Sequence, residues 1–254
     1  MNGMERIIPR SVLITGAAGA IGSALARAYS APGTALFLGD SAAEALKEVE
    51  ADCLSLGATV QGKAVDVTDR EGMRQWVVEA HESVPLDLVM VIAGVSRGTI
   101  KREETAEEAR EVFAVNLDGM LNAFLFVLPL MRSRGNGQIA LMSSLAGTRG
   151  FPVAPSYCAT KAAIRTYGES WRARLRRENI HVTVINTGFI ESPMTKANPY
   201  RMPLLVGTDR AARIIKRRLE RAPAEITFPW PVSLAARCLS LLPSAWFGRA
   251  AMLK

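Results

Sequence analysis

The stretch Ser11-Val-Leu-Ile-Thr-Gly16-Ala-Ala-Gly19-Ala-Ile-Gly22-Ser-Ala-Leu-Ala-Arg-Ala-Tyr29 decides how this chain folds. Its apolar start is typical of a buried strand and its alanine-rich end is typical of a helix, with a glycine-rich turn between them. Such a turn lets backbone N–H groups approach a pyrophosphate at the start of the helix. The alternative interpretation is a tight turn that binds no ligand.

Strand and helix patterns alternate along the rest of the chain. Apolar runs predict strands at residues 34–39, 59–65, 86–92, 138–142, 180–185 and 225–228. Helices are predicted at residues 41–56, 69–83, 104–133 and 208–221, and around Tyr157 as far as about residue 178. This alternation predicts a parallel sheet with helices on both faces. The predicted fold class is therefore α/β, a single Rossmann-type doubly wound parallel sheet of about seven strands, with residues 1–254 forming one domain.

Composition narrows the class of protein. Of the 254 residues 49% are hydrophobic, so the chain can bury a sizeable core. The cysteines Cys53, Cys158 and Cys238 are far apart and odd in number, which argues against a disulfide framework or a metal site and favours a reducing compartment. The chain shows neither a signal-peptide pattern nor an apolar run of eighteen residues. We therefore expect a cytoplasmic protein, with peripheral membrane association as an open alternative.

Basic residues are concentrated in the last third of the chain. Residues 161–254 contain 17 Lys and Arg against 6 Asp and Glu, whereas residues 1–160 contain 14 against 18. Such an excess attracts phosphates, anionic lipid head groups or an acidic carrier protein. The alternative is a set of solvated helix faces. No nucleic-acid recognition motif accompanies the charge, so we expect no nucleic-acid partner.

Asp40 ends the second predicted strand, 18 residues after Gly22. This is close to the spacing expected of an acidic residue that binds a ribose 2′-hydroxyl. Ser41 follows, and neither it nor the glycine turn offers a basic side chain, so a 2′-phosphate would face an uncompensated carboxylate. The pattern favours NAD over NADP. Alternatively Asp40 caps the helix that follows, and both roles can hold together.

The segment Ser156-Tyr157-Cys-Ala-Thr-Lys161 places a phenol and an ammonium one helical turn apart. A nearby positive charge favours the phenolate and so lowers the pKa of the phenol. A phenol with a lowered pKa can give or accept a proton near neutral pH, as general acid–base catalysis requires. The same spacing also occurs on surface helices that have no catalytic role.

Several motifs together resemble the short-chain dehydrogenase/reductase family, of the roughly 250-residue type, over about residues 10–195. Thr15-Gly16-x-x-x-Ala20-x-Gly22 is similar to the family's cofactor turn, and Asp66-Val67 resembles its adenine-contacting pair. The segment from Thr187-Gly188 to Ser192 resembles the part that closes over the nicotinamide. The family's catalytic tetrad is matched by Asn116, Ser144, Tyr157 and Lys161, with the usual serine-to-tyrosine spacing of thirteen.

The resemblance implies a set of cofactor contacts. They are Gly16, Ala18, Ala20, Ile21, Gly22, Asp40, Asp66, Val67, Ala93, Gly94, Tyr157, Lys161, Gly188, Ile190 and Ser192. The implied cofactor is NAD, with NADP less favoured. The family's other partners would be a small-molecule alcohol or ketone and further copies of the chain in a homodimer or homotetramer.

The resemblance also implies a role for each member of the tetrad. Tyr157 would be the general acid in carbonyl reduction and the general base in alcohol oxidation, and Lys161 would hold the ribose hydroxyls of the nicotinamide. Ser144 would hydrogen-bond the substrate oxygen, whereas Ser143 lies fourteen residues from Tyr157. Asn116 would order a water that links Lys161 to solvent. Without the resemblance, Ser144 would be interpreted as a structural hydroxyl at the end of a strand, and Asn116 as an amide that links segments of the core.

The chain departs from the family pattern at four places. Ala20 replaces the middle glycine of the turn, and Val91-Ile92-Ala93-Gly94 replaces Asn-Asn-Ala-Gly. The missing asparagine normally braces neighbouring strands, so local sheet stability is in question. Thr187-Gly188 replaces Pro-Gly, and Ser192 replaces a threonine but keeps the hydroxyl.

Residues 189–207 correspond to the family's substrate lid. We expect an apolar pocket from Phe189, Met194, Tyr200 and Met202, with Arg97 and Arg149 at its mouth.

Residues 229–254 form an apolar C-terminal extension that is broken by prolines and contains Trp230 and Trp246. Beside the basic helix at residues 208–221, this extension could lie at a membrane surface. The alternatives are a contact between subunits or a cover over the substrate cleft.

The predicted function is an NAD(P)(H)-dependent oxidoreductase that transfers a hydride between nicotinamide and an apolar or lipid-like secondary alcohol or ketone. One alternative is a 3-oxoacyl-thioester reductase of lipid or capsule synthesis. A non-enzymatic alternative is a Rossmann-fold cofactor sensor or scaffold, although such proteins tend to lose the tetrad that is intact here.

Overall fold

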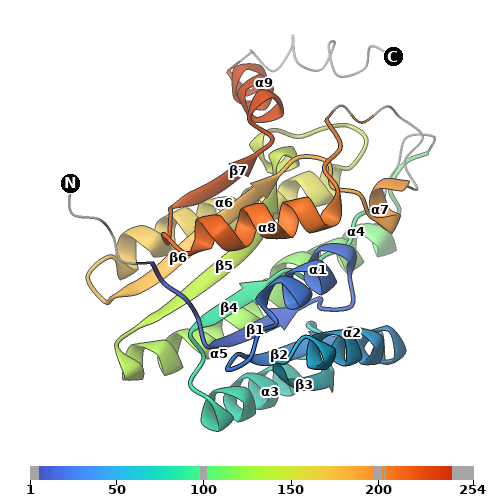
Figure 1. The fold of residues 1–254 in the computed structure, drawn as a ribbon. Helices are drawn as coiled ribbons and strands as arrows, with labels where there is room; N and C mark the ends of the chain where they lie inside the picture. Colours follow the sequence, from blue (N-terminus) through green and yellow to red (C-terminus); the bar gives the residue numbers. More distant parts are fainter. Residues whose placement is uncertain (1–5, 98–101, 197–201, 203, 242–254) are drawn as a thin grey trace.

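The strands form one parallel sheet in the order β3-β2-β1-β4-β5-β6-β7 (Figure 1). This computed structural model describes residues 6–97, 102–196, 202 and 204–241. The strands are β1 (Ser11–Thr15), β2 (Ala35–Asp40), β3 (Thr59–Ala64), β4 (Leu88–Val91), β5 (Gly137–Ser144), β6 (Ile180–Thr187) and β7 (Glu225–Phe228). All seven predicted strands are present, and the predicted Rossmann-type α/β fold is confirmed.

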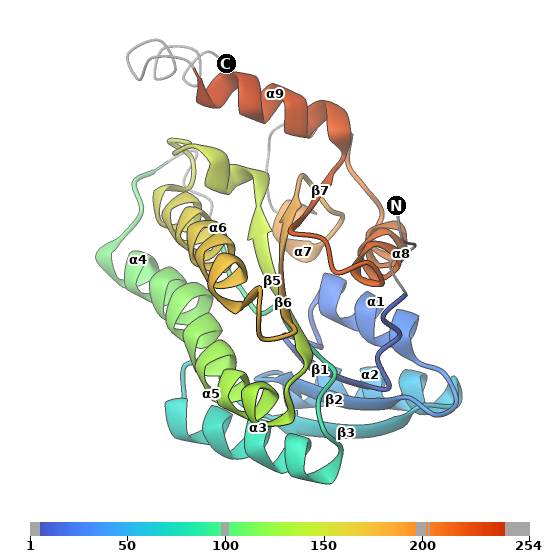
Figure 2. The ribbon, with the colours of Figure 1, turned by 90° about the vertical axis from the view of Figure 1, so that its left-hand side faces the viewer.

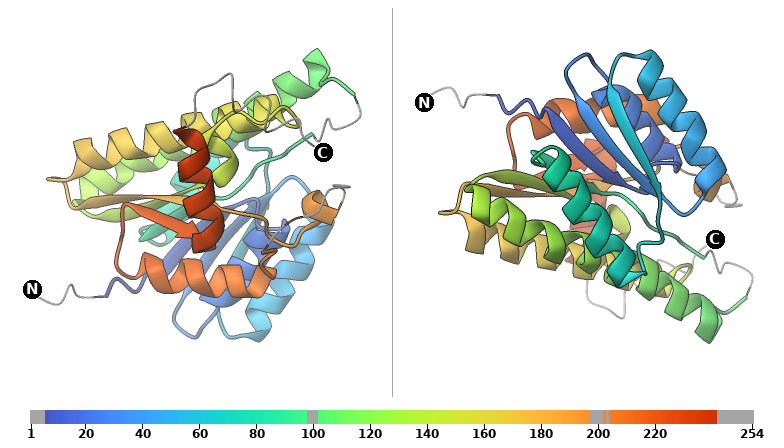
Figure 3. Two further views of the ribbon diagram at one scale, coloured as in Figure 1. Left: turned by 90° about the horizontal axis from the view of Figure 1, so that it is seen from above. Right: turned by 90° about the horizontal axis from the view of Figure 1, so that it is seen from below.

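Helices cover both faces of the sheet (Figure 2). One face carries α1 (Ala20–Tyr29), α2 (Ala43–Ser55) and α8 (Thr208–Leu219), and the other carries α3 (Arg70–Ser83), α5 (Gly119–Arg134) and α6 (Pro155–Leu175). Seen from below, α2 and α3 flank the β3 edge on opposite faces (Figure 3). The shorter segments are α4 (Ala106–Phe113), the π-helical η1 (Ala114–Asp118), the 3₁₀-helical η2 (Leu145–Thr148), α7 (Pro193–Lys196) and α9 (Trp230–Ser240).

The central strands are apolar throughout because both of their faces are buried. In β1, Val12 and Ile14 join the core beneath α1 and α8, whereas Leu13 joins the core beneath α3 and α5. Every residue of β4 is buried. This is the uninterrupted hydrophobic pattern of a parallel sheet that is covered on both sides.

The single helix predicted at residues 104–133 is wrong in detail. The structure divides it into α4, the π-helical η1 and α5. A π-helical turn inserts an extra residue into the helix and is frequent at functional sites. Here it contains Asn116, whose buried amide binds partners outside the helix. Periodicity does not reveal such a turn, because the residues around it keep a helical pattern.

The run from Ala106 to Arg134 is long and apolar enough to cross a membrane by length and composition alone. Its residues Met120, Phe124 and Val127 are buried in the core under α5. The apolar pattern is that of a helix packed against the sheet, and length and composition are weak grounds for a membrane span.

Thr15 connects the neighbouring strands that the family's asparagine, absent from the Val91-Ile92-Ala93-Gly94 segment, would normally brace. The Thr15 hydroxyl accepts hydrogen bonds from the backbone N–H groups of Ile92 at 3.1 Å and Ala93 at 3.3 Å. These bonds tie the end of β1 to the loop after β4.

The extension after residue 229 begins with a helix, which the proline pattern did not predict. Pro231 lies in the first turn of α9, where its missing N–H costs no helical bond. The guanidinium of Arg149 donates to the carbonyls of Leu239 (3.1 Å) and Ser240 (2.9 Å) at the end of this helix. The rest of the extension, residues 242–254, lies outside the described residues.

Candidate active site

The predicted site residues lie at the carboxyl ends of the parallel strands. Thr15 ends β1 and pairs in register with Gly39 of β2 and Val91 of β4, and Ser144 of β5 pairs with Thr187 of β6. The loops that follow these strands therefore meet at one edge of the sheet, which is where open α/β sheets bind ligands.

The glycine turn after β1 needs its first and last glycines. Gly16 has a φ of +71°, and a Cβ there would lie 2.7 Å from the Cα of Ala93. A Cβ on Gly22 would lie 2.0 Å from the carbonyl oxygen of Gly16. The N-cap residue of α1 is Gly19, so no side chain accepts the N–H groups at the start of this helix. The first turn, which begins at Ala20, contains no acidic residue. The N–H groups of Ala20, Ile21 and Gly22 therefore belong to an uncapped helix start that fits the pyrophosphate of a dinucleotide.

Asp40 holds the glycine turn as well as the start of α2. One carboxylate oxygen accepts the backbone N–H of Ala18 and the other accepts that of Ala42, both at 3.0 Å. The expectation that Asp40 is the N-cap of α2 is wrong, because the N-cap residue is Ala42, two positions later. Both oxygens keep a second lone pair that can accept ribose hydroxyls.

The pair Asp66-Val67 is fixed by its neighbours. Asp66 accepts hydrogen bonds from the N–H and the hydroxyl of Thr68, each at 2.8 Å. The side-chain amide of Asn122 donates to the carbonyl of Val67 at 2.8 Å, and Gly119 packs against the Val67 side chain. Sequence reasoning missed Asn122, although a polar amide within the apolar part of a helix is a signal that could have found it.

Lys161 is buried at the centre of the site. Its side chain is 3% exposed, and Nζ donates to the carbonyl of Met142 at 2.9 Å. Nζ also lies 5.6 Å from the centroid of the Tyr157 ring, as one helical turn requires. Burial lowers the pKa of Lys161 to about 8, because a low-dielectric surrounding disfavours the charged form.

Gly94 lies beside both Lys161 and Asn116. A Cβ at Gly94 would be 3.2 Å from the Lys161 Nζ and 3.1 Å from the Asn116 Oδ1. The loop after β4, helix α6 and the π-helical η1 therefore converge at this glycine, which leaves little space for any side chain.

Asn116 ties these segments together. Its Oδ1 accepts the N–H of Val95 at 2.7 Å, and its amide nitrogen donates to the Val95 carbonyl at 3.0 Å and to the Thr160 hydroxyl at 3.1 Å. Both amide hydrogens thus donate to groups of the protein, as expected of an asparagine that links segments of the core. The predicted water-ordering role stays a prediction, and it rests on the second lone pair of Oδ1.

The two neighbouring serines at the end of β5 have different environments. The Ser143 hydroxyl donates to the Lys161 carbonyl at 2.7 Å and is fully enclosed, so it is a structural bond between β5 and α6. The Ser144 hydroxyl makes only a longer bond, of 3.3 Å, to the Thr187 carbonyl, and it accepts the N–H of Ala146. Ser144 can therefore turn its proton toward a ligand more readily than Ser143 can.

The segment after β6 has a defined start. The N–H of Gly188 donates to the Phe228 carbonyl at 2.9 Å, and Ile190 is buried in a bridge with Val206. The Ser192 hydroxyl accepts the N–H of Thr195, so it caps the short helix α7.

The predicted substrate pocket is described only in part. Phe189 and Met202 are half-buried, whereas Tyr200 and the side chain of Met194 lie outside the described residues. Arg97 forms an ion pair with Glu111, and Arg149 donates to carbonyls at the end of α9. The placement of both arginines at the pocket mouth stays a prediction.

Glu104 is a further site residue that sequence reasoning missed. Its carboxylate accepts the hydroxyl of Ser156 at 2.5 Å and the Ser156 N–H at 3.3 Å. The cap residue Ala154 offers no side-chain bond, so Glu104 caps the helix that carries Tyr157. The two residues are 52 positions apart, and no local pattern could have connected them.

A family model described as short chain dehydrogenase matches residues 10–202. The chain belongs to the short-chain dehydrogenase family. This family acts with NAD(P), so the protein is an NAD(P)-dependent oxidoreductase, and the glycine turn and the uncapped start of α1 fit such a cofactor.

Relatives of this short-chain dehydrogenase span most of its length. It is 32% identical, over 98% of both chains, to a protein of Myxococcus xanthus named as an uncharacterized oxidoreductase. It is 31% identical to the 3-oxoacyl-(acyl-carrier-protein) reductase of Thermotoga maritima, over 76% of this chain and 79% of the relative.

Solved structures share the fold. A 3-ketoacyl-ACP reductase of Sinorhizobium meliloti has a TM-score of 0.78 at 27% identity and covers 89% of this chain and 99% of its own. A short chain dehydrogenase of Mycobacterium paratuberculosis bound to NAD has a TM-score of 0.77 at 23% identity, with 86% and 95% coverage.

Proposed function

We propose that this short-chain dehydrogenase transfers a hydride between NAD(H) and an apolar or lipid-like secondary alcohol or ketone, with Tyr157 as the general acid and base. The observation that carries the proposal is the buried Lys161 ammonium beside the Tyr157 ring, at the strand edge where the glycine turn also lies. Burying a cation without a carboxylate partner lowers stability, so a lysine kept in this position points to a functional role.

The roles of the side chains follow from this arrangement. The nicotinamide, when bound, supplies or accepts the hydride. In ketone reduction Tyr157 gives its proton to the substrate oxygen, and in alcohol oxidation it takes that proton away. The Lys161 charge favours the phenolate that remains after proton transfer. The Ser144 hydroxyl donates a hydrogen bond to the substrate oxygen and stabilises the charge that develops there.

NAD(H) is favoured over NADP(H) by the carboxylate of Asp40. Hydrogen bonds to Ala18 and Ala42 hold this carboxylate at the end of β2. Ser41 is exposed and uncharged, so no cation there would neutralise a 2′-phosphate next to Asp40.

A specific observation favours a second candidate within the same chemistry. The relatives from Thermotoga maritima and Sinorhizobium meliloti are named as acyl-carrier-protein-linked reductases. A 3-oxoacyl thioester of lipid or capsule synthesis is therefore the alternative substrate class. A sensor or scaffold without turnover is a weaker candidate, because such a protein gains nothing from a buried lysine.

Self-association and location belong to the same proposal. The half-exposed Phe113 and Leu125 support a homodimer or homotetramer through α4 and α5. We propose a cytoplasmic enzyme that contacts a membrane surface through α9.

The decisive experiment is a panel of ketones, alcohols and 3-oxoacyl thioesters assayed with NADH and NADPH. We expect turnover with apolar ketones and a preference for NADH.

Tyr157→Phe should lose at least about a hundredfold in turnover, as loss of a general acid does, and should still bind NADH. Tyr167→Phe, on the same helix but packed against Phe124 and Trp171, is the matched control and should keep its activity. Normal turnover in Tyr157→Phe would overturn the assignment.

A further inference from the structure

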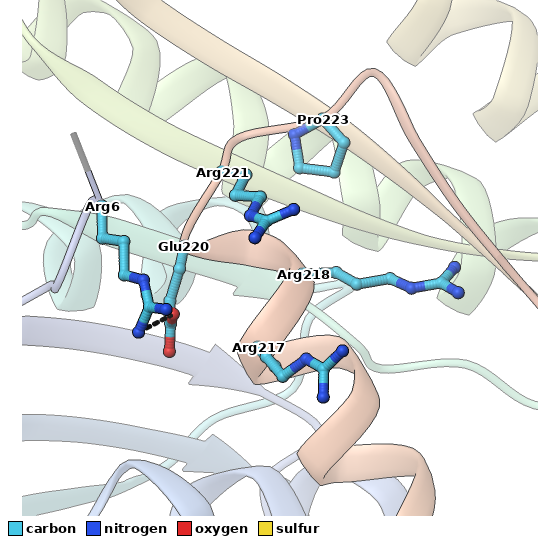
Figure 4. Close-up of a pocket in the computed structure, with 6 residues that line it drawn as sticks. All are labelled: Arg6, Arg217, Arg218, Glu220, Arg221 and Pro223. Carbon is cyan, nitrogen blue, oxygen red and sulfur yellow. Dashed lines mark ion pairs between the residues drawn. The ribbon is translucent and has the colours of Figure 1, made fainter. Parts of the chain in front are cut away.

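A groove lined by arginines lies at the edge of the sheet where the strands begin (Figure 4). It is a cavity of about 590 Å³ lined by Arg6, Arg217, Arg218, Glu220, Arg221 and Pro223. These residues precede β1, end α8 and form the turn into β7. The tetrad lies near the opposite edge, where the strands end, so the arginine groove is separate from the active site.

The arginine groove carries more positive charge than its own residues neutralise. The lining contains four guanidinium groups and one carboxylate, which leaves a net charge of +3. Glu220 pairs with Arg6 at 3.7 Å, and Arg218 donates to the Thr227 carbonyl at 3.0 Å. Within the part of the chain that the structure describes, Arg217 and Arg221 have no carboxylate partner.

A fifth guanidinium lies under the turn that bounds the arginine groove. Arg172 donates to the carbonyls of Val182 (2.7 Å), Ala222 (3.0 Å) and Pro223 (3.1 Å). The Thr183 hydroxyl also donates to the Pro223 carbonyl, at 2.7 Å. Because these bonds fix the turn, the wall of the groove is pre-formed, and Arg172 adds to the positive potential without a carboxylate of its own.

The helix dipole does not account for this concentration of charge. Cations near a helix C-terminus are stabilising, and Arg217 and Arg218 lie in the last turn of α8. The dipole there is equivalent to only about half a negative charge. Most of the positive charge in the arginine groove therefore remains available to an external anion.

We propose that the arginine groove binds a small molecule that carries adjacent phosphate groups. Guanidinium groups match phosphate oxygens in paired, charge-assisted hydrogen bonds. The volume falls within the range of about 300–1,000 Å³ that is usual for small-ligand sites. Pro223 and the aliphatic stems of the arginines supply the apolar surface of the groove, so its specificity rests on the guanidinium groups. A concave site of this size favours a small anion over a flat membrane surface.

Calorimetry of the full-length protein with inorganic pyrophosphate tests the proposal. We expect saturable binding in buffer whose ionic strength is matched with sodium chloride. Arg217→Gln with Arg221→Gln should weaken binding at least about tenfold, because two charge-assisted contacts are lost. Arg210→Gln with Arg213→Gln, which removes the same charge from exposed sites on α8 outside the groove, should leave binding unchanged.

Three outcomes would overturn the proposal. The first is no binding of pyrophosphate to the wild-type protein. The second is equal binding in the Arg217→Gln, Arg221→Gln variant, which would place pyrophosphate elsewhere, for example at the glycine turn after β1. The third is binding of anionic phosphatidylglycerol vesicles, but not pyrophosphate, that depends on Arg217 and Arg221. Circular dichroism of both double variants confirms that each is folded.

Discussion

At the scale of single residues, function and stability oppose one another at Lys161. Its Nζ donates to the Met142 carbonyl, and the residue is buried. Burial lowers the pKa of Lys161 to about 8, so below that pH the folded protein holds a charge that would be better solvated in the unfolded chain. This cost is consistent with the proposed role of the ammonium, which is to favour the Tyr157 phenolate.

We therefore expect Lys161→Met to abolish turnover while raising the free energy of unfolding near pH 7 by on the order of 1–2 kcal/mol. The gain should shrink above about pH 8. Between that pH and the usual pKa of about 10.5, the unfolded wild-type chain binds a proton that the folded chain has lost, so wild-type stability rises with pH. Urea unfolding of both proteins near pH 7 and near pH 10 measures the difference. A variant that is less stable at both pH values would contradict this reasoning.

Glu104 accepts the hydrogen bonds of Ser156 at the start of α6, the helix that carries Tyr157. Glu104→Ala removes the acceptor of the Ser156 N–H and hydroxyl, and we expect it to lower the free energy of unfolding by about 1 kcal/mol, as loss of a cap does. Turnover should fall as well, because Tyr157 follows Ser156 directly. Glu104→Gln keeps an acceptor oxygen and should restore most of the stability. Equal unfolding midpoints in wild type and Glu104→Ala would show that the contact contributes nothing.

At the scale of elements, the end of β2 controls the turn after β1 through Asp40. Asp40→Ala with Ser41→Arg should raise the ratio of NADPH to NADH efficiency at least about tenfold, since a cation replaces an anion beside the ribose. Affinity for both cofactors should fall, because Ala18 and Ala42 lose their acceptor. Steady-state kinetics with both cofactors measure the ratio, and Ser41→Ala is the control. An unchanged ratio would mean that Asp40 does not face the ribose.

Helix α9 presents an apolar stripe to solvent. Trp230, Leu234 and Leu241 are 74%, 55% and 85% exposed, and their spacing of four and seven residues places them on one face. Seen from above, α9 lies over the β7 end of the sheet (Figure 3). This stripe fits the proposed membrane contact of the C-terminal extension, and it fits a contact between subunits as well.

Leu234→Glu with Leu241→Glu should reduce co-sedimentation with lipid vesicles at least about fivefold, because charged groups replace apolar area in the lipid interface. Leu54→Glu with Leu56→Glu, at comparably exposed leucines around the end of α2, should have no effect. If the wild-type protein does not sediment with vesicles, the stripe serves contacts between subunits or covers the cleft instead.

At the scale of the whole molecule, parallel strands create two chemically different edges. The edge at the carboxyl ends holds the glycine turn and the carboxylates Asp40 and Asp66. The tetrad lies there on β5, η1 and α6. The opposite edge holds the arginine groove. The basic excess of residues 161–254 is thus partly gathered into one concave site, which a count of charges along the chain does not reveal.

The sequence by itself determined the strands, the parallel sheet, the glycine turn and the spacing of Ser144, Tyr157 and Lys161. These features depend on local patterns, because apolar runs and glycine turns act within a few residues of one another. The structure alone decided the partners of Asn116 and Thr15, the cap that Glu104 supplies to α6 and the bond from Arg149 to α9. These contacts join residues 21 to 91 positions apart, so they exist only once packing has brought the elements together.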